Sequence, residues 1–230
     1  MFGRGHTGWM PLHRPTLRIA SSVAVTVGTY GVAFGAAGVA AGFSVLQTCL
    51  FSLIAFTGAS QFAAVGVVGS GGTPLSAIAA ATLLGVRNTL YGVQLAPLLR
   101  TRGWRRALAA QITIDESTGV ALGQVREGTV AMRQGFWLTG GGVYVFWNIA
   151  TLVGASGAHL FGDPSQWGLD AAVPAAFLAL VWPRLETTFL RAVAGASVLF
   201  CLGVTPLLPV GLPIVATTLV ALVAGWSERG

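Results

Sequence analysis

PLSAIAAATLLGVRNTLYGVQLAPLL, residues Pro74–Leu99, contains a single charged residue, Arg87, near its middle. Arg87 is also the only formal charge between Ile19 and Leu99. In a helix that rises about 1.5 Å per residue it lies roughly 20 Å from either end of the segment, near the centre of a bilayer. A cation at that depth costs at least about 2.5 kcal/mol on insertion scales, so it usually has both a partner and a function.

The composition of the chain is that of an integral membrane protein. Apolar residues make up 54% of it, charged residues make up 9%, and the mean hydropathy is +0.75, whereas soluble domains average about 25% charged residues. Several stretches exceed the roughly 18 apolar residues that mark a spanning helix, and they lack the alternation of barrel strands. We therefore predict an all-α, polytopic integral membrane helical bundle with about six to eight membrane segments. The bundle is expected to form one domain over residues 1–230, with a cytoplasmic segment at 1–18 and the helices at 19–226.

The positive charge of the chain indicates its orientation. The net charge is +6, and it comes from thirteen arginines without any lysine. Because the arginines lie at the ends of apolar segments, as they do in cytoplasmic loops, we expect a lipid bilayer and no nucleic acid as the partner. Both termini are expected in the cytoplasm. The sequence contains no HExxH pattern and no metal-ligand spacing of cysteines, so we predict no catalytic residue, no metal and no cofactor.

Glycines follow one face of the first apolar segment, at 19–42. They step by three or four residues and are Gly28, Gly31, Gly35, Gly38 and Gly42. Small residues at this spacing allow another helix backbone to approach closely, which stabilises packing in lipid. The pattern predicts a packing seam, with a backbone-lined permeation path as the alternative.

Two segments are expected to be broken. The N-terminus and the Arg100–Arg106 cluster should both be cytoplasmic, but three full crossings between them would place them on opposite sides. We therefore predict that 44–69 is re-entrant, with its break at Gly58–Gln61, since irregular backbone at membrane depth needs cover from protein or a water-filled cavity. The alternative is that one basic cluster violates the rule. Residues 107–124 are expected to form a second broken or re-entrant element, with an amphipathic surface helix as the alternative.

The later part of the chain predicts simpler crossings. Apolar stretches indicate spans over about 135–157, 171–183, 190–204 and 210–226. An acidic loop at 159–170 is then expected outside the cell.

Polar side chains around Arg87 form the first candidate site. On a helix, Arg87, Tyr91 and Gln94 share one face at i, i+4 and i+7, and Asn88 lies beside Tyr91. The guanidinium is always protonated and its planar fork suits a carboxylate. Arg87 is therefore expected either to bind a substrate carboxylate or to be a structural ion-pair partner.

Two further groups are candidates. Asp115 and Glu116 are acids in an apolar stretch, where burial disfavours the charged carboxylate and a nearby cation favours it. We expect them to couple a proton or to pair with Arg87 or the Arg100–Arg106 cluster. The predicted break exposes backbone groups that attract ions. Gly58, Ser60 and Gln61 are therefore candidate substrate contacts.

The chain resembles the AzlC-type branched-chain amino acid exporter family. Four stretches carry the resemblance, in the same order: FTGASQFAAVGVV (Phe56–Val68), VRNTLYGVQLAP (Val86–Pro97), DESTGVAL (Asp115–Leu122) and PAAFLALVWP (Pro174–Pro183). The resemblance covers about residues 18–226. It implies the large subunit of a bacterial inner-membrane exporter, with a small multi-span subunit of the AzlD type as its partner. Family members typically read Asn-Leu-Arg-His where this chain has Gly85-Val86-Arg87-Asn88, so the arginine is kept and its two polar neighbours differ.

Three classes of function are open to a chain with these features. The leading hypothesis is a secondary transporter subunit that exports small neutral, branched-chain amino acids. The alternative is an accessory or scaffold membrane subunit with no translocation path of its own. An intramembrane enzyme is disfavoured, because the adjacent acids Asp115 and Glu116 point to different sides of a helix and no Ser/His arrangement accompanies them.

Overall fold

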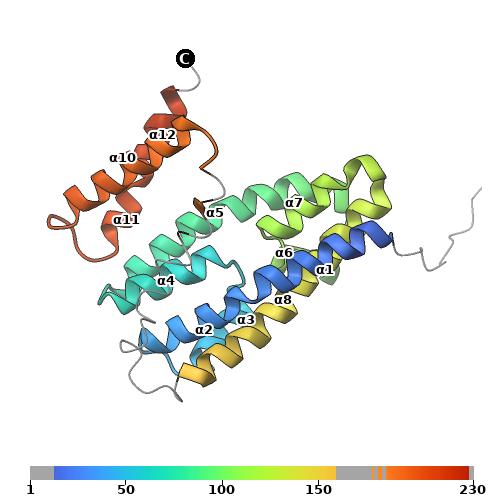
Figure 1. The fold of residues 1–230 in the computed structure, drawn as a ribbon, viewed down its shortest axis with the longest axis horizontal. Helices are drawn as coiled ribbons and strands as arrows, with labels where there is room; N and C mark the ends of the chain where they lie inside the picture. Colours follow the sequence, from blue (N-terminus) through green and yellow to red (C-terminus); the bar gives the residue numbers. More distant parts are fainter. Residues whose placement is uncertain (1–12, 159–177, 179–180, 183–184, 228–230) are drawn as a thin grey trace, which may run out of the picture. The chain divides into compact units, whose positions relative to one another are not determined.

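The computed structural model describes residues 13–158, 178, 181–182 and 185–227, and its regular elements are all helical. The helices are α1 (Arg14–Gly28), α2 (Tyr30–Ala40), α3 (Val45–Ile54), α4 (Ala59–Gly69), α5 (Pro74–Leu99), α6 (Trp104–Gln111), α7 (Asp115–Gly123), the 3-10 turn η1 (Val125–Glu127), α8 (Thr129–Ala158), α10 (Thr188–Val204), α11 (Leu212–Ala216) and α12 (Thr218–Ser227). Figure 1 shows their course. The all-α prediction is confirmed. The predicted loop at 159–170 and most of the predicted span at 171–183 lie outside the described residues.

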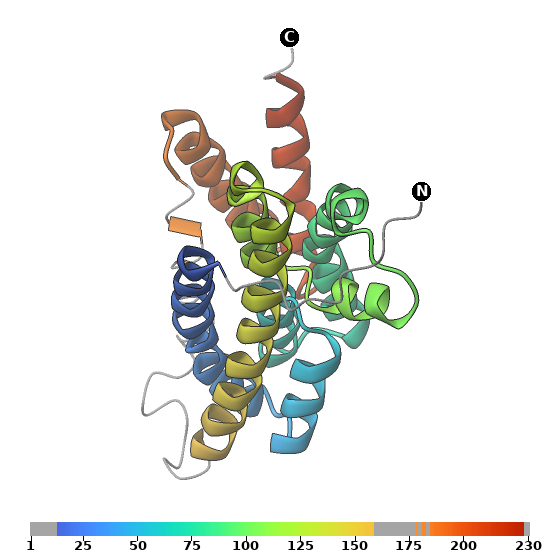
Figure 2. The same cartoon turned by 90° about the vertical axis from the view of Figure 1, so that its right-hand side faces the viewer.

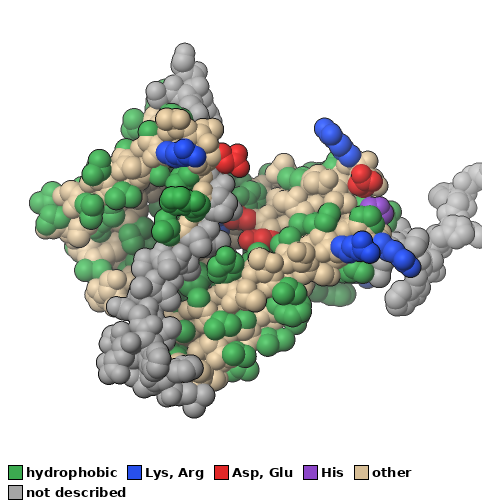
Figure 3. Space-filling model, in the orientation of Figure 1, with side chains coloured by type: hydrophobic (Ala, Val, Ile, Leu, Met, Phe, Trp, Pro, Cys, Tyr) green, Lys and Arg blue, Asp and Glu red, His purple; other side chains and the backbone are tan. Residues whose placement is uncertain are grey.

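Two stretches are long and apolar enough to cross a membrane by length and composition. They are Arg14–Ala40, which joins α1 and α2, and Thr129–Ala158, which is α8. The shorter apolar helices are α3, α4, α10 and the stretch Leu212–Trp226. Large apolar side chains stay exposed on several helices, for example Ile54 and Val153, and Figure 3 shows hydrophobic side chains over the visible surface. Exposed apolar area of this extent is typical of lipid-facing helices.

The described helices group into two compact units. The first contains the described residues up to Gly28 together with Leu90–Phe146, and the second contains Thr29–Thr89 and the described residues from Trp147 onward. The chain therefore passes between units at the junction of α1 and α2, within α5 and within α8. The prediction of one integral membrane domain stays a prediction.

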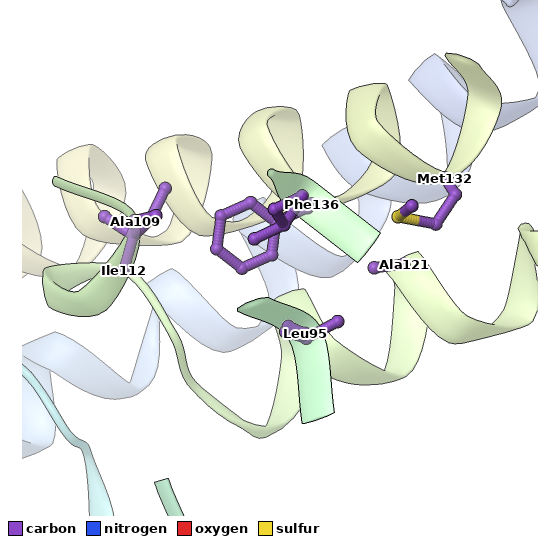
Figure 4. Packing of buried hydrophobic residues seen from close by; sticks show 7 residues of the cluster. Leu95, Ala109, Ile112, Ala121, Met132 and Phe136 are labelled. Atoms are coloured by element: carbon purple, nitrogen blue, oxygen red, sulfur yellow. The ribbon is translucent and has the colours of Figure 1, made fainter. Parts of the chain in front are cut away.

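The first unit has a core built from four helices. Its buried cluster is Leu95, Leu99, Ala109, Ile112, Ala121, Met132 and Phe136, from α5, α6, α7 and α8 with the residue after α6. Figure 4 shows Phe136 at the centre of this cluster. Helix α1 lies beside the first part of α8 (Figures 1 and 2), where a Cβ on Gly142 would lie 2.8 Å from the Ala24 Cβ.

Helix α1 is tied to the first unit by hydrogen bonds at its start. The His13 N–H donates to Gln134 Oε1 at 2.9 Å, and the fully buried Thr16 hydroxyl donates to Gln124 Oε1 at 2.9 Å. The apolar helix therefore begins at Arg14, earlier than the predicted Ile19, and it ends at Ala40. A local irregularity at Thr29, whose carbonyl accepts from the Val32 N–H at 3.1 Å, divides it into α1 and α2.

In the second unit α2 packs backbone to backbone against the last part of α8. A Cβ on Gly31 would collide with the Trp147 carbonyl, and one on Gly35 would collide with the Thr151 carbonyl. The contact is reciprocal, because a Cβ on Gly154 of α8 would collide with the Val32 carbonyl. The predicted packing seam is therefore confirmed at Gly31 and Gly35, whereas Gly38 meets Thr48 of α3 and nothing lies within 4 Å of the Cβ position of Gly42.

An aromatic cluster closes the second unit around this seam. The Phe34 ring stacks on Trp147 with centroids 6.0 Å apart, and it meets Phe62 edge-on at 5.6 Å. Phe51 of α3 lies 6.0 Å from Phe34. Phe34 and Phe62 are fully buried, so α2 holds both α3 and α4 through one side chain.

The C-terminal helices pack on α4 and α5 through α11. Val215 packs against the cluster of Ala63, Ala64, Val67, Ala77 and Ala80. Gly211 adopts φ +91° and comes so close that a Cβ would lie 2.7 Å from a Val67 methyl. The predicted span at 190–204 matches α10. The predicted span at 210–226 is divided at Thr217 into α11 and α12.

Replacing Gly35 with alanine is expected to lower stability by about 1–3 kcal/mol, because the new methyl group forces the two backbones apart. The Cβ would lie 2.6 Å from the Ala155 nitrogen, which no side-chain rotation can relieve. The midpoint of thermal unfolding in detergent measures the effect. Gly141→Ala on α8 is the control, since nothing lies within 4 Å of its Cβ position. Equal melting points for the two variants would contradict the seam.

Candidate functional site

The site begins at a break between two short helices of the second unit. Helix α3 ends at Ile54, α4 begins at Ala59, and Gly58 between them adopts φ +61° and ψ −91°, a conformation that favours glycine. The helices have 10 and 11 residues, which span only about 15–17 Å each, so neither crosses a bilayer of about 30 Å alone. The prediction of a broken helix is confirmed, but the break lies at 55–58, and Ala59–Gln61, which were predicted to be part of it, form the first turn of α4.

Gln61 holds the break together. Its side-chain oxygen accepts from the Gly58 N–H at 3.1 Å, and its amide nitrogen donates to the Phe51 carbonyl in a longer contact of 3.5 Å. The side chain is fully buried. One amide therefore satisfies backbone groups on both sides of the break, and its predicted contact with a substrate stays a prediction.

Ser60 brings the start of α4 against the middle of α5. Its hydroxyl lies 3.6 Å from where a Cβ on Gly85 would stand, and the residue is 6% exposed. The missing side chain at Gly85 makes this close approach possible. Asn88 follows one helical turn further along α5, and Arg87 precedes it, so the break lies near the part of α5 that carries these side chains.

Polar atoms without hydrogen-bond partners mark this region. They are the Ser60 hydroxyl, the Asn88 side-chain oxygen and the Trp147 indole nitrogen, all of them buried. Trp147 also covers the break, since the outer edge of its ring lies 4.0 Å from the Cβ position of Gly58. Each unsatisfied buried polar group costs about 1–3 kcal/mol, so native structures usually keep such groups for a ligand or a water.

Helix α5 presents two different faces around Arg87. Val86, Leu90 and Val93 are exposed, whereas Arg87, Asn88 and Tyr91 are half-buried. Gln94 is exposed in the single chain, unlike Arg87 and Tyr91 on the same predicted face. The roles of Tyr91 and Gln94, which belong to the first unit, stay predictions.

The acids lie in the first unit at a second break. Helix α6 ends at Gln111, and Asp115 and Glu116 form the first turn of α7, where the helix dipole favours negative charge. The predicted broken element is thus confirmed, with the break at 112–114, just before the acids. Arg87 belongs to the other unit, and its pairing with either acid stays a prediction.

Ser117 is the residue that sequence reasoning missed. It is fully buried, accepts from the Ile114 N–H at 3.0 Å and donates to the Ile112 carbonyl at 2.7 Å. It therefore spans its break as Gln61 spans the other. Its position three residues after the helix cap was the available signal. Trp147 was missed as well, because its contact with Gly58 joins residues far apart in the chain.

Among the described residues, no group of three or more His, Cys, Asp or Glu could hold a metal ion. The polar groups of the site are thus amides, hydroxyls, an indole and a guanidinium. These recognise carboxylates and other hydrogen-bonding groups of a small molecule.

Replacing Gln61 with alanine is expected to destabilise the chain by about 1–3 kcal/mol, because the Gly58 N–H would stay buried without an acceptor. Gln47→Ala is the matched control. Gln47 accepts from the Ser44 N–H at 2.8 Å in the same capping position of α3, but both residues are exposed, so water replaces the lost bond. Thermal unfolding in detergent compares the two variants. A Gln47 variant that melts as low as the Gln61 variant would show that burial of the break does not matter.

One comparison with known proteins identifies a family for this chain. The family model described as AzlC protein matches residues 22–161. The matched region contains both breaks, Arg87 and the two acids, but not the stretch Pro174–Pro183. No curated protein and no solved structure matches the chain. The chain belongs to the AzlC family of membrane transport proteins, which is associated with branched-chain amino acid transport.

Proposed function

We propose that this chain is the large subunit of a secondary transporter that exports small neutral, branched-chain amino acids across a bacterial inner membrane. One observation carries the proposal: buried polar atoms of Ser60 and Asn88 have no hydrogen-bond partner beside a broken helix. Family membership supports the substrate class. Discontinuous helices of this kind form the substrate sites of many transporters.

The chemistry of the site matches the carboxylate of an amino acid. The guanidinium of Arg87 offers a planar pair of donors, which fits a carboxylate in a bidentate way. The first N–H groups of α4 have no intrahelical acceptor and carry partial positive charge, so they favour the same anion. Ser60 and Asn88 add a hydroxyl and an amide. We therefore assign Arg87, Ser60 and Asn88 to the carboxylate end of the substrate.

The other roles follow from chemistry in the same way. Export against a gradient needs a coupling ion, and Asp115 and Glu116 are candidates to take up and release a proton. A small multi-span membrane subunit of the AzlD type is the proposed partner. Apolar side chains such as Leu199 and Leu222 are exposed on α10 and α12 and are available to that subunit or to lipid.

Replacing Arg87 with glutamine is expected to slow leucine efflux by about 10–100-fold, since a hydrogen-bonded charge contact is worth about 1.5–3 kcal/mol. Cells are loaded with a leucine-containing dipeptide, and intracellular leucine is followed with and without the chain and its small subunit. Arg126→Gln is the matched control, because Arg126 is an exposed arginine on η1. Efflux unchanged by Arg87→Gln would overturn the assignment.

A charge exchange distinguishes our proposal from the alternative of a scaffold subunit without a translocation path. A chain with Arg87→Asp and Asp115→Arg keeps one charge of each sign but removes the cation from its position beside Asn88. Under our proposal this double variant stays inactive although it is inserted and stable. Full efflux from it would mean that pairing alone is sufficient and that Arg87 does not bind substrate.

The re-entrant topology is expected to place Ser44 and Ser70 on the same side of the membrane. Both are exposed and flank the pair α3 and α4. Single cysteines at these positions, in a chain whose Cys49 and Cys201 are replaced, are treated with a membrane-impermeant thiol reagent on intact cells. Labelling of both from outside is the expected result. Labelling from opposite sides would show that the pair crosses the membrane.

A further inference from the structure

The first unit contains a cavity that the transport proposal does not use. It has a volume of about 980 Å³ and lies between the end of α5, helix α6 and the start of α8. The residues that line it include Arg100, Arg102, Trp104, Arg105, Arg133 and Trp137. Pockets of about 300–1,000 Å³ are large enough to bury most of a drug-sized molecule.

The charge of the lining has one sign. Four of the lining residues are arginines and none is an acid. Two of the arginines are held by backbone carbonyls: Arg133 donates to the Leu98 carbonyl at 3.2 and 3.3 Å, and Arg100 donates to the Pro97 carbonyl at 3.4 Å. Such a cavity favours an anion, and guanidinium forks match the oxygens of a phosphate group.

Apart from the polar Thr101, Thr129 and Gln134, the rest of the lining is apolar and aromatic. Trp104 is 70% exposed, with Arg105 stacked 5.7 Å from the centre of its ring, and Leu108 is also exposed. Deeper in the cavity, Leu99 belongs to the buried core and Trp137 packs against it. Exposed tryptophan beside arginine and leucine on a short helix is typical of the membrane interface, where lipid headgroups meet acyl chains.

We propose that this cavity binds the headgroup of an anionic phospholipid. Arg102 and Arg105 contact the phosphate from the rim, Arg100 and Arg133 contact it from the wall, and Trp104 with Leu108 lies against the start of the acyl chains. A free inorganic phosphate would use the arginines but not the apolar wall. The cavity lies at the start of α8, a helix long enough to span the bilayer. A ligand bound there would therefore be within reach of the membrane surface.

The full-length protein, purified in detergent, tests this assignment by native mass spectrometry. Apparent dissociation constants for the first bound lipid are compared for phosphatidylglycerol and for phosphatidylcholine with the same acyl chains, and inorganic phosphate is added as a competitor. Arg105→Gln removes one lining charge. Arg106→Gln is the matched control, because Arg106 is an equally exposed neighbour on α6 that does not line the cavity.

The wild type is expected to bind phosphatidylglycerol at least about fivefold more tightly than phosphatidylcholine. Arg105→Gln is expected to weaken phosphatidylglycerol binding about fivefold, which is the contribution of one arginine near an anionic surface, and Arg106→Gln is expected to weaken it by less than about twofold.

Equal binding of the two lipids, or equal losses in the two variants, would overturn the proposal. Displacement of the lipid by millimolar inorganic phosphate would reveal a free-anion site instead. If Arg105→Gln does not fold, the wild-type lipid comparison and Arg105→Lys, which keeps the charge but loses the fork, still decide the outcome.

Discussion

Backbone polar groups in a membrane must find hydrogen-bond partners inside the protein. At each of the two helix breaks in this chain, one buried side chain provides them. Gln61 accepts from the Gly58 N–H and reaches the Phe51 carbonyl, while Ser117 accepts from the Ile114 N–H and donates to the Ile112 carbonyl. These hydrogen bonds satisfy the backbone groups that the missing helical turn leaves without partners. Other polar groups near each break are then available to bind a ligand. The transport proposal depends on these two breaks.

The two breaks share one local arrangement although they belong to different units. In each, a threonine precedes the helix cap, and the capping side chain follows three residues later, as Gln61 after Gly58 and as Ser117 after Ile114. Each broken element is followed by a long helix, α5 in one case and α8 in the other. The chemistry at the two places differs, because the first break lies beside Arg87 on α5 and the second opens a helix with Asp115 and Glu116.

In the second unit, closely packed helices lie next to buried polar side-chain atoms that have no hydrogen-bond partner. Glycines let α2 and α8 touch through their backbones, which places Trp147 against the break at Gly58. The wall around the site is therefore closely packed, whereas Ser60 and Asn88 keep polar atoms without partners. This arrangement is expected of a binding site, since the favourable packing of the surrounding helices offsets the free-energy cost of polar groups left without hydrogen bonds.

The sequence by itself determined the helical class, the membrane environment, both breaks and the isolated position of Arg87. Hydropathy and local turn chemistry act over a few residues, so they can be read without the fold. The tertiary structure decided which helix the glycines contact, that Gln61 bridges the backbone, that Ser117 matters, and that four arginines share one cavity with two tryptophans. The glycine contacts join residues about 120 positions apart in the chain, as Gly35 and Ala155 are. Side-chain packing sets such pairs, and local pattern carries no information about it.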